Sequence, residues 1–138
     1  MLYFALALLL IAATLGFVLG FKYLLSTSFT PYHAQVVGKP CAQLEPQVQA
    51  IIVGMLRVIG GGFLGLAATV AWLAYALLAG ARWAPWALAT IALTTLLPAL
   101  GVALSLRKIE PRANTPVVPS ILAIGLILLG AGLGSLAN

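Results

Sequence analysis

The sequence predicts an all-α, polytopic membrane protein built as a bundle of four transmembrane helices. Of the 138 residues, 63% are hydrophobic and only 7% are charged, whereas soluble domains carry about 25% charged residues. The apolar residues gather in long runs of about 20, the length that a helix needs to cross a hydrocarbon core of about 30 Å. These runs show no alternation of polar and apolar positions, which favours helices over a barrel. So few charges exclude a soluble protein.

We expect one domain over residues 1–138, with spans at Leu2–Leu25, Val48–Ala79, Pro85–Leu106 and Val117–Ala137. The first run has no basic residue before its apolar part and is longer than a signal-peptide core of about 7–15 residues. We therefore expect a retained helix. Lys22 follows its apolar part, where an ammonium group can reach the interface.

The first connection, residues 26–47, is the longest polar stretch and is interrupted by Pro31, Gly38 and Pro40. We expect a loop with room for a short interfacial turn. Pro46 suits the first turn of the second helix, and Glu45 before it complements the helix dipole. The second helix is thus predicted to begin outside the membrane.

The second connection is short, and Pro85 is expected to open the third helix with Trp83 and Trp86 as interfacial anchors. Pro98 lies near the middle of the third span and removes a backbone hydrogen bond. A kink satisfied by Thr94 or Thr95 is the structural interpretation, because membrane helices tolerate such kinks. A hinge or a cavity lining is the functional alternative.

Lys and Arg are distributed unequally between the two sides of the predicted bundle. The third connection, residues 107–116, is basic and interrupted by prolines, so we expect a solvated loop. The side that holds loops one and three carries Lys22, Lys39, Arg57, Arg107, Lys108 and Arg112, and the other side carries only Arg82. The positive-inside rule therefore predicts cytoplasmic loops one and three and both termini outside. Basic residues scattered in this way do not form a nucleic-acid surface.

Small residues at helical spacing predict close helix packing, which marks helix interfaces in a bilayer. The residues concerned are Ala12, Gly16 and Gly20 in the first span, Gly61 and Gly65 in the second, and Gly130 and Gly134 in the fourth. The spacing leaves open whether each stripe faces its own chain or a second protomer.

Arg57 is the one charge that falls inside a hydrophobic run. A position at the cytoplasmic interface is a sufficient explanation. The alternative is functional: Arg57 shares a helical face with Gly54, Gly61 and Gly65, which would direct the guanidinium toward protein. It would then pair with Glu45 or Glu110, or with a lipid or ligand headgroup.

Groups able to do chemistry are otherwise scarce. His33, Cys41 and Glu45 share the first loop, but their spacing matches no compact ligand pattern, so no metal site is expected. His33 is expected to be an interfacial side chain and a headgroup candidate beside Tyr32. Cys41, the only cysteine, allows no internal disulfide, and its role stays open. No span holds the carboxylate of a proton-coupled antiporter or the His of a haem site, and no cofactor is expected.

The run from Met55 to Leu66, with Arg57 before three glycines, and the Arg82-Trp83-Ala84-Pro85 segment resemble small, uncharacterised four-helix bacterial membrane proteins that are broadly DoxX-like. The segments Pro31-Tyr32-His33 and Leu44-Glu45-Pro46 are also similar to features of such proteins. The resemblance implies a fold and a bacterial inner-membrane setting, and it places no catalytic residue on this chain.

Two functions follow as expectations. The first is a structural or accessory protein of the cell inner membrane that binds membrane lipid or an apolar partner, because packing glycines are abundant and reactive groups are not. The second is a homo-oligomeric channel or transporter with Arg57 at an anion or headgroup site. A homo-oligomer or a partner membrane protein is compatible with both. An enzyme is the least favoured class, given the scarcity of acids, bases and nucleophiles.

Overall fold

The computed structural model describes residues 1–137, which form helices and connections without a strand. Four helical stretches are long and apolar enough to cross a membrane: Leu2–Leu24, Pro46–Leu78, Ala84–Ile109 and Val117–Ala137. They are α1, α3, the α4–η2–α5 stretch and α6. The prediction of an all-α chain with four apolar helices is confirmed. Pro46 opens α3, two residues earlier than the predicted span, because its missing N–H costs nothing in the first turn.

The first connection contains two short helices, α2 (Pro31–Val37) and the 3₁₀ helix η1 (Cys41–Gln43). Pro31 begins α2, and Gly38 ends it with φ of 74°, in the left-handed region that favours glycine. The expected interfacial turn is therefore a helix of seven residues.

The third apolar stretch is divided into α4 (Ala84–Ile91), a π-helical segment η2 (Ala92–Leu96) and α5 (Leu97–Ile109). Pro98 in the first turn of α5 lacks an N–H, and its ring would clash with the carbonyl of the preceding turn of a regular helix. The wider π turn relieves that clash. The hydroxyls of Thr94 and Thr95 donate to carbonyls one turn earlier, Thr94 to Thr90 at 2.8 Å and Thr95 to Ile91 at 2.5 Å.

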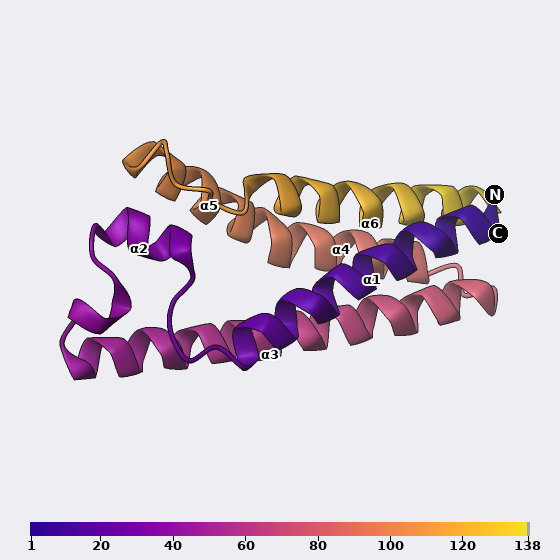
Figure 1. Ribbon diagram of the computed structural model, residues 1–138. Helices are drawn as coiled ribbons and strands as arrows, with labels where there is room; N and C mark the ends of the chain where they lie inside the picture. Colours follow the sequence, from indigo (N-terminus) through magenta and orange to yellow (C-terminus); the bar gives the residue numbers. More distant parts are fainter. Residues whose placement is uncertain (138) are drawn as a thin grey trace.

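The helices pack closely at one end of the molecule and separate at the other (Figure 1). At the first end lie both termini and the α3–α4 connection; there α1 packs against α3 and α6, and α4 packs against α6 and α3. We call this the closed end. Its core includes Leu9, Val70, Leu77 and Leu88, each at most 1% exposed.

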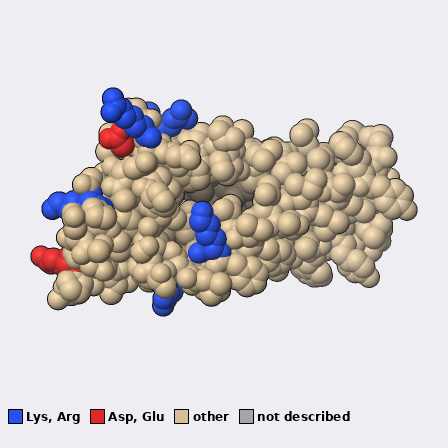
Figure 2. All heavy atoms as spheres, in the orientation of Figure 1, with Lys and Arg blue, Asp and Glu red and all other residues tan. Residues whose placement is uncertain are grey.

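At the opposite end, which we call the open end, α5 packs against α6 and diverges from α3 (Figure 1). The short helix α2 lies between the two. A small second core forms here from Tyr23, Phe29 and Leu56, with Cys41 and Leu44 packed against it. In the face shown in Figure 2, the Lys, Arg, Asp and Glu side chains lie toward the open end.

Four glycines of α1 and α6, Gly16, Gly20, Gly130 and Gly134, lie at helix contacts. A Cβ added at Gly16 would lie 3.0 Å from the Cβ of Ala67, and one at Gly20 would lie 2.7 Å from Leu64. On α6, a Cβ at Gly130 would meet Leu9 at 2.8 Å. A Cβ at Gly134 would meet Leu77 at 2.5 Å, and Ala12 of α1 is 7% exposed.

In α3 the contact falls on a different glycine from those expected. A Cβ at Gly60 would overlap the backbone nitrogen of Leu24 and lie 2.8 Å from the carbonyl of Gly20. Gly61 and Gly65 have nothing within 4 Å, so they face away from the other helices of the chain. The reason is rotation: one residue turns the helix by about 100°, and Gly60, not Gly61, shares its face with the buried Ala67.

Candidate functional site

An apolar cavity of about 310 Å³ lies at the open end, between α1, α3, α5 and α6 and beside α2. This volume falls within the range of about 300–1,000 Å³ that is usual for small-molecule sites. The cavity is lined by Leu19, Tyr23, Tyr32, His33, Leu56, Ile59, Phe63, Leu96, Ala99, Val102, Ala103, Leu106, Pro116, Pro119, Ser120 and Ala123.

A second apolar cavity, of about 290 Å³, adjoins the first and reaches toward the closed end, where Ala12, Val70 and Ile127 line it. The residues common to both cavities are Leu19, Phe63, Leu96, Pro119 and Ala123. The shared lining places the two cavities next to each other, with Phe63 of α3 and Leu96 of η2 where they adjoin.

The sequence creates this space through its small side chains and through η2. Ala99 and Ala103 of α5 and Ala123 of α6 present only methyl groups to the cavity. Leu96, the last residue of η2, is 5% exposed and lines both cavities. Pro98 itself is exposed and is not part of the lining, so its effect on the cavity acts through the path of α5.

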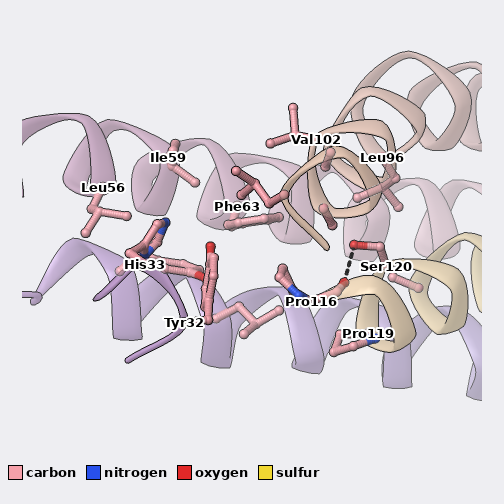
Figure 3. Close-up of a pocket in the computed structure, with 16 residues that line it drawn as sticks. Tyr32, His33, Leu56, Ile59, Phe63, Leu96, Val102, Pro116, Pro119 and Ser120 are labelled. Atoms are coloured by element: carbon pink, nitrogen blue, oxygen red, sulfur yellow. Dashed lines mark hydrogen bonds between the residues drawn. The ribbon is translucent and has the colours of Figure 1, made fainter. Parts of the chain in front are cut away.

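Two polar side chains of the cavity, Tyr32 and His33, lie where α2 meets it, and Ser120 lies apart from them on α6 (Figure 3). Tyr32 and His33 come from α2, and their ring centroids are 4.0 Å apart. Nδ1 of His33 forms a hydrogen bond with Oγ1 of Thr30 at 2.7 Å. Ser120 of α6 donates its hydroxyl to the carbonyl of Pro116 at 2.7 Å, so its proton is already used (Figure 3).

The side chains of Tyr32 and His33 are both uncharged near neutral pH. Burial raises the pKa of the Tyr32 hydroxyl above its usual value, and its hydrogen bond with Tyr23 raises that pKa further. Burial also lowers the pKa of His33 below its ordinary 6.5, because a half-buried imidazolium loses hydration. This end of the cavity therefore offers neutral hydrogen-bonding groups.

The α2 helix links the first connection, in which it lies, to the α5–α6 connection. Oε1 of Gln35 accepts a hydrogen bond from the backbone N–H of Asn114 at 3.3 Å, which joins α2 to the α5–α6 connection. On its other side, Phe29 before α2 is buried with Tyr23 and Leu56. The helix thus spans from α1 and α3 to the start of α6, across the open end.

The three residues predicted from sequence as headgroup candidates, His33, Arg57 and Glu45, have different surroundings in the structure. His33 lines the cavity. Arg57 is exposed and is not among the lining residues, and its Nε donates to the carbonyl of Ser26 at 3.4 Å. Glu45 is exposed at the N-cap of α3. Within residues 1–137 no salt bridge joins Arg57 to Glu45 or Glu110, so the expected pairing is not formed.

The direction expected for Arg57 is also corrected, because Gly54, Gly61 and Gly65 face open space and not another helix. Among the described residues, no group of three or more His, Cys, Asp or Glu side chains lies close enough together to hold a metal ion.

Sequence reasoning missed most of the lining, including Tyr32, Phe63 and Ser120 as site residues. The pair Tyr32-His33 was the available signal, since adjacent hydrogen-bonding side chains in a short helix after an apolar span mark an interface. Apolar lining residues carry no such signal, because they are indistinguishable in sequence from residues that face lipid.

Comparison of the chain with known protein families, curated proteins and solved structures finds no match. The chain's own geometry is a set of four apolar helices around two adjoining apolar cavities, with uncharged polar groups beside α2.

Proposed function

We propose that this is a multi-pass membrane protein of accessory type that binds a membrane amphiphile, with the hydrocarbon chain in the two adjoining cavities. The observation that carries the proposal is that two apolar cavities, of about 310 and 290 Å³, adjoin each other and share five lining residues. Adjoining apolar cavities of this kind suit an acyl or prenyl chain better than a compact polar solute. Inside a bilayer, neither the hydrocarbon chain nor the cavity lining has to be withdrawn from water. Close packing between the chain and the lining therefore supplies the affinity.

A membrane location supports the same proposal. We infer that the four apolar helices insert in a bilayer, because 17–28% of each apolar window is buried and the rest requires an apolar solvent. We place the open end on the cytoplasmic side by the positive-inside rule, with both termini outside. A bacterial inner membrane and membership of the DoxX-like proteins are parts of this proposal that rest on the motifs around Arg57 and Arg82.

The position of the cavity relative to the membrane surface fits an amphiphile. The 33 residues of α3 would extend about 50 Å at 1.5 Å per residue, well beyond a hydrocarbon core of about 30 Å. If Arg57 marks the interface, then α2 and the first turns of α3 lie in the headgroup region. The chain would run from there toward the middle of the bilayer, with its polar end at α2.

Retention of lipid through purification tests the proposal. The protein is purified in a mild detergent, and bound lipid is counted by native mass spectrometry. Ala123→Leu adds bulk to both cavities, and Ala68→Leu adds the same bulk at an exposed site on α3. We expect lipid bound to the wild type and to Ala68→Leu and lost from Ala123→Leu. Equal retention by both variants would show that the cavity is not the site.

The channel alternative has a separate test. Flux of a labelled anion into liposomes that contain the protein, abolished by Arg57→Ala, would favour that function. The amphiphile proposal expects no flux, because Arg57 is exposed and the cavity lining within residues 1–137 carries no charge. A homo-oligomer or a partner membrane protein stays a prediction, and the outward-facing Gly61 and Gly65 are where such a contact would be sought.

A further inference from the structure

We propose that the polar end of the ligand is an uncharged hydrogen-bonding group, an ester carbonyl or a hydroxyl, and that Tyr32 and His33 of α2 hold it. The inference rests on the proposed amphiphile-binding function and names the class of ligand. It excludes lipids whose phosphate or carboxylate would have to enter the cavity.

The first step is the charge of the lining. Over the described part of the chain, neither cavity is lined by an Asp, Glu, Lys or Arg side chain. A charged group moved from water into such a space would lose its hydration without gaining a counter-charge, which is strongly unfavourable. A neutral polar group loses much less, and hydrogen bonds to the lining offset that loss.

The second step is the position of the polar atoms. The hydroxyl of Tyr32 and the imidazole of His33 lie together on α2, facing Phe63 and Ile59 of α3 across the cavity (Figure 3). Since Nδ1 of His33 is engaged with Thr30, Nε2 is the ring atom available to a ligand. A phenol both donates and accepts, so the Tyr32 hydroxyl, although it bonds with Tyr23, can form a further hydrogen bond. Nε2 of His33 donates or accepts depending on the tautomer. A hydroxyl or a carbonyl on the ligand can satisfy both groups.

The third step is the position of the cations. Lys22 precedes the lining residue Tyr23, and Arg57 follows the lining residue Leu56, but neither cation is itself in the lining. Both side chains are exposed. They are placed to meet the headgroups of surrounding anionic lipid, while the α2 side chains meet the polar end of the bound molecule.

Two ligands that differ only in charge test the inference. Monopalmitoylglycerol and palmitoyl lysophosphatidate share the chain and the glycerol, and only the second carries a phosphate. Delipidated full-length protein is mixed with both at equal concentration, and occupancy is read by native mass spectrometry. We expect monopalmitoylglycerol to occupy the protein at least about five-fold more, because the phosphate would lose hydration beside a lining that offers it no counter-charge. Equal occupancy, or a preference for the phosphate, would overturn the inference and leave the amphiphile function standing.

Variants of α2 test the assignment of residues. Tyr32→Phe and His33→Phe remove the hydrogen-bonding atoms and keep an aromatic ring, so each is expected to weaken monopalmitoylglycerol binding about five-fold. Tyr75→Phe, on the exposed face of α3, is the matched control and is expected to bind as the wild type does. Full affinity in both α2 variants would overturn the assignment. Binding of neither ligand to the wild type, or binding that Ala123→Leu does not reduce, would overturn the proposed function itself. If an α2 variant does not fold, the two-ligand comparison on the wild type still decides.

Discussion

Gly60 fixes the closest approach of α1 and α3. An added methyl group there would overlap the backbone nitrogen of Leu24 and crowd the carbonyl of Gly20, and backbone atoms cannot rotate away as a side chain can. A methyl group added at the next residue, Gly61, would have no atom of another helix within 4 Å. Two adjacent glycines in one helix thus have opposite tolerance for a side chain.

Gly60→Ala is therefore expected to destabilise the protein by about 1–3 kcal/mol through overpacking. Gly61→Ala is the control and is expected to be neutral or to stabilise the helix by up to about 1 kcal/mol, since alanine is the better helix former. Thermal unfolding in detergent measures both. Equal effects of the two variants would contradict the assigned packing face.

His33 gives the stability of the protein a dependence on pH. Its folded-state pKa is lowered by burial, so the unfolded chain takes up a proton at a higher pH than the folded one does. The stabilisation from the neutral, buried form is complete above the ordinary pKa of 6.5 and decreases as the pH falls below it.

The unfolding temperature of the wild type is accordingly expected to fall between pH 7.5 and pH 5.5. His33 is the only histidine in the chain, so His33→Phe is expected to reduce that fall. The comparison of the two proteins by thermal scan at both pH values measures the effect of this one group. An identical pH dependence in the variant would mean that His33 is hydrated in the folded state.

At the scale of elements, the apolar helices could be predicted from sequence and the open end could not. The length and hydropathy of each run are local properties, and they placed the α1, α3 and α6 boundaries within two residues. The divergence of α5 from α3 begins after a π-helical segment that precedes Pro98, and the hydropathy of the run does not distinguish a π turn from an α turn. Within the chain, α3 packs against α1 through Gly60 and not through Gly61 or Gly65, because small-residue spacing does not distinguish adjacent stripes. A contact of Gly61 and Gly65 with a second protomer stays a prediction.

The candidate site illustrates the same limit. His33 could be predicted from the chemistry of its side chain. Phe63, Leu96 and Ala123 could not, because they line the cavities only where three helical segments come together. Arg57 was predicted as a candidate because it is the one charge in an apolar run, yet its side chain is exposed beside the cavity lining.

The position of α2 across the open end predicts that it controls entry to the cavity. Its hydrogen bond from Asn114 to Gln35 is the contact that joins it to the α5–α6 connection. In a Cys41→Ser background, Gln35→Cys and Asn114→Cys are joined by a short, reducible thiol cross-linker. We expect exchange of a labelled monoacylglycerol to slow after cross-linking and to recover on reduction. Unchanged exchange would mean that ligands enter laterally between the long helices.

At the scale of the whole molecule, the few charges define an axis. The open end carries Lys22, Lys39, Arg57, Arg107, Lys108 and Arg112, and Arg82 lies in the α3–α4 connection at the closed end. This asymmetry predicts one orientation in the membrane, with α2 and the entrance to the cavity on the cytoplasmic side.

Cysteine labelling tests that orientation. In the Cys41→Ser background, a cysteine is introduced at the exposed residue Gln43 or at the exposed residue Ala79. A membrane-impermeant maleimide added to intact cells is expected to label position 79 and not position 43, and to label both after permeabilisation. The reverse pattern would overturn the predicted orientation.

One hydrocarbon chain is proposed to occupy both cavities, passing Phe63 and Leu96. A crystal structure of the protein grown in a lipid mesophase with monopalmitoylglycerol tests this occupancy most directly. We expect continuous, chain-shaped density through both cavities, with its polar end in hydrogen-bond contact with Tyr32 or His33. A structure in which α5 closes against α3 and the lipid density lies only on the outer helix faces would contradict the claim.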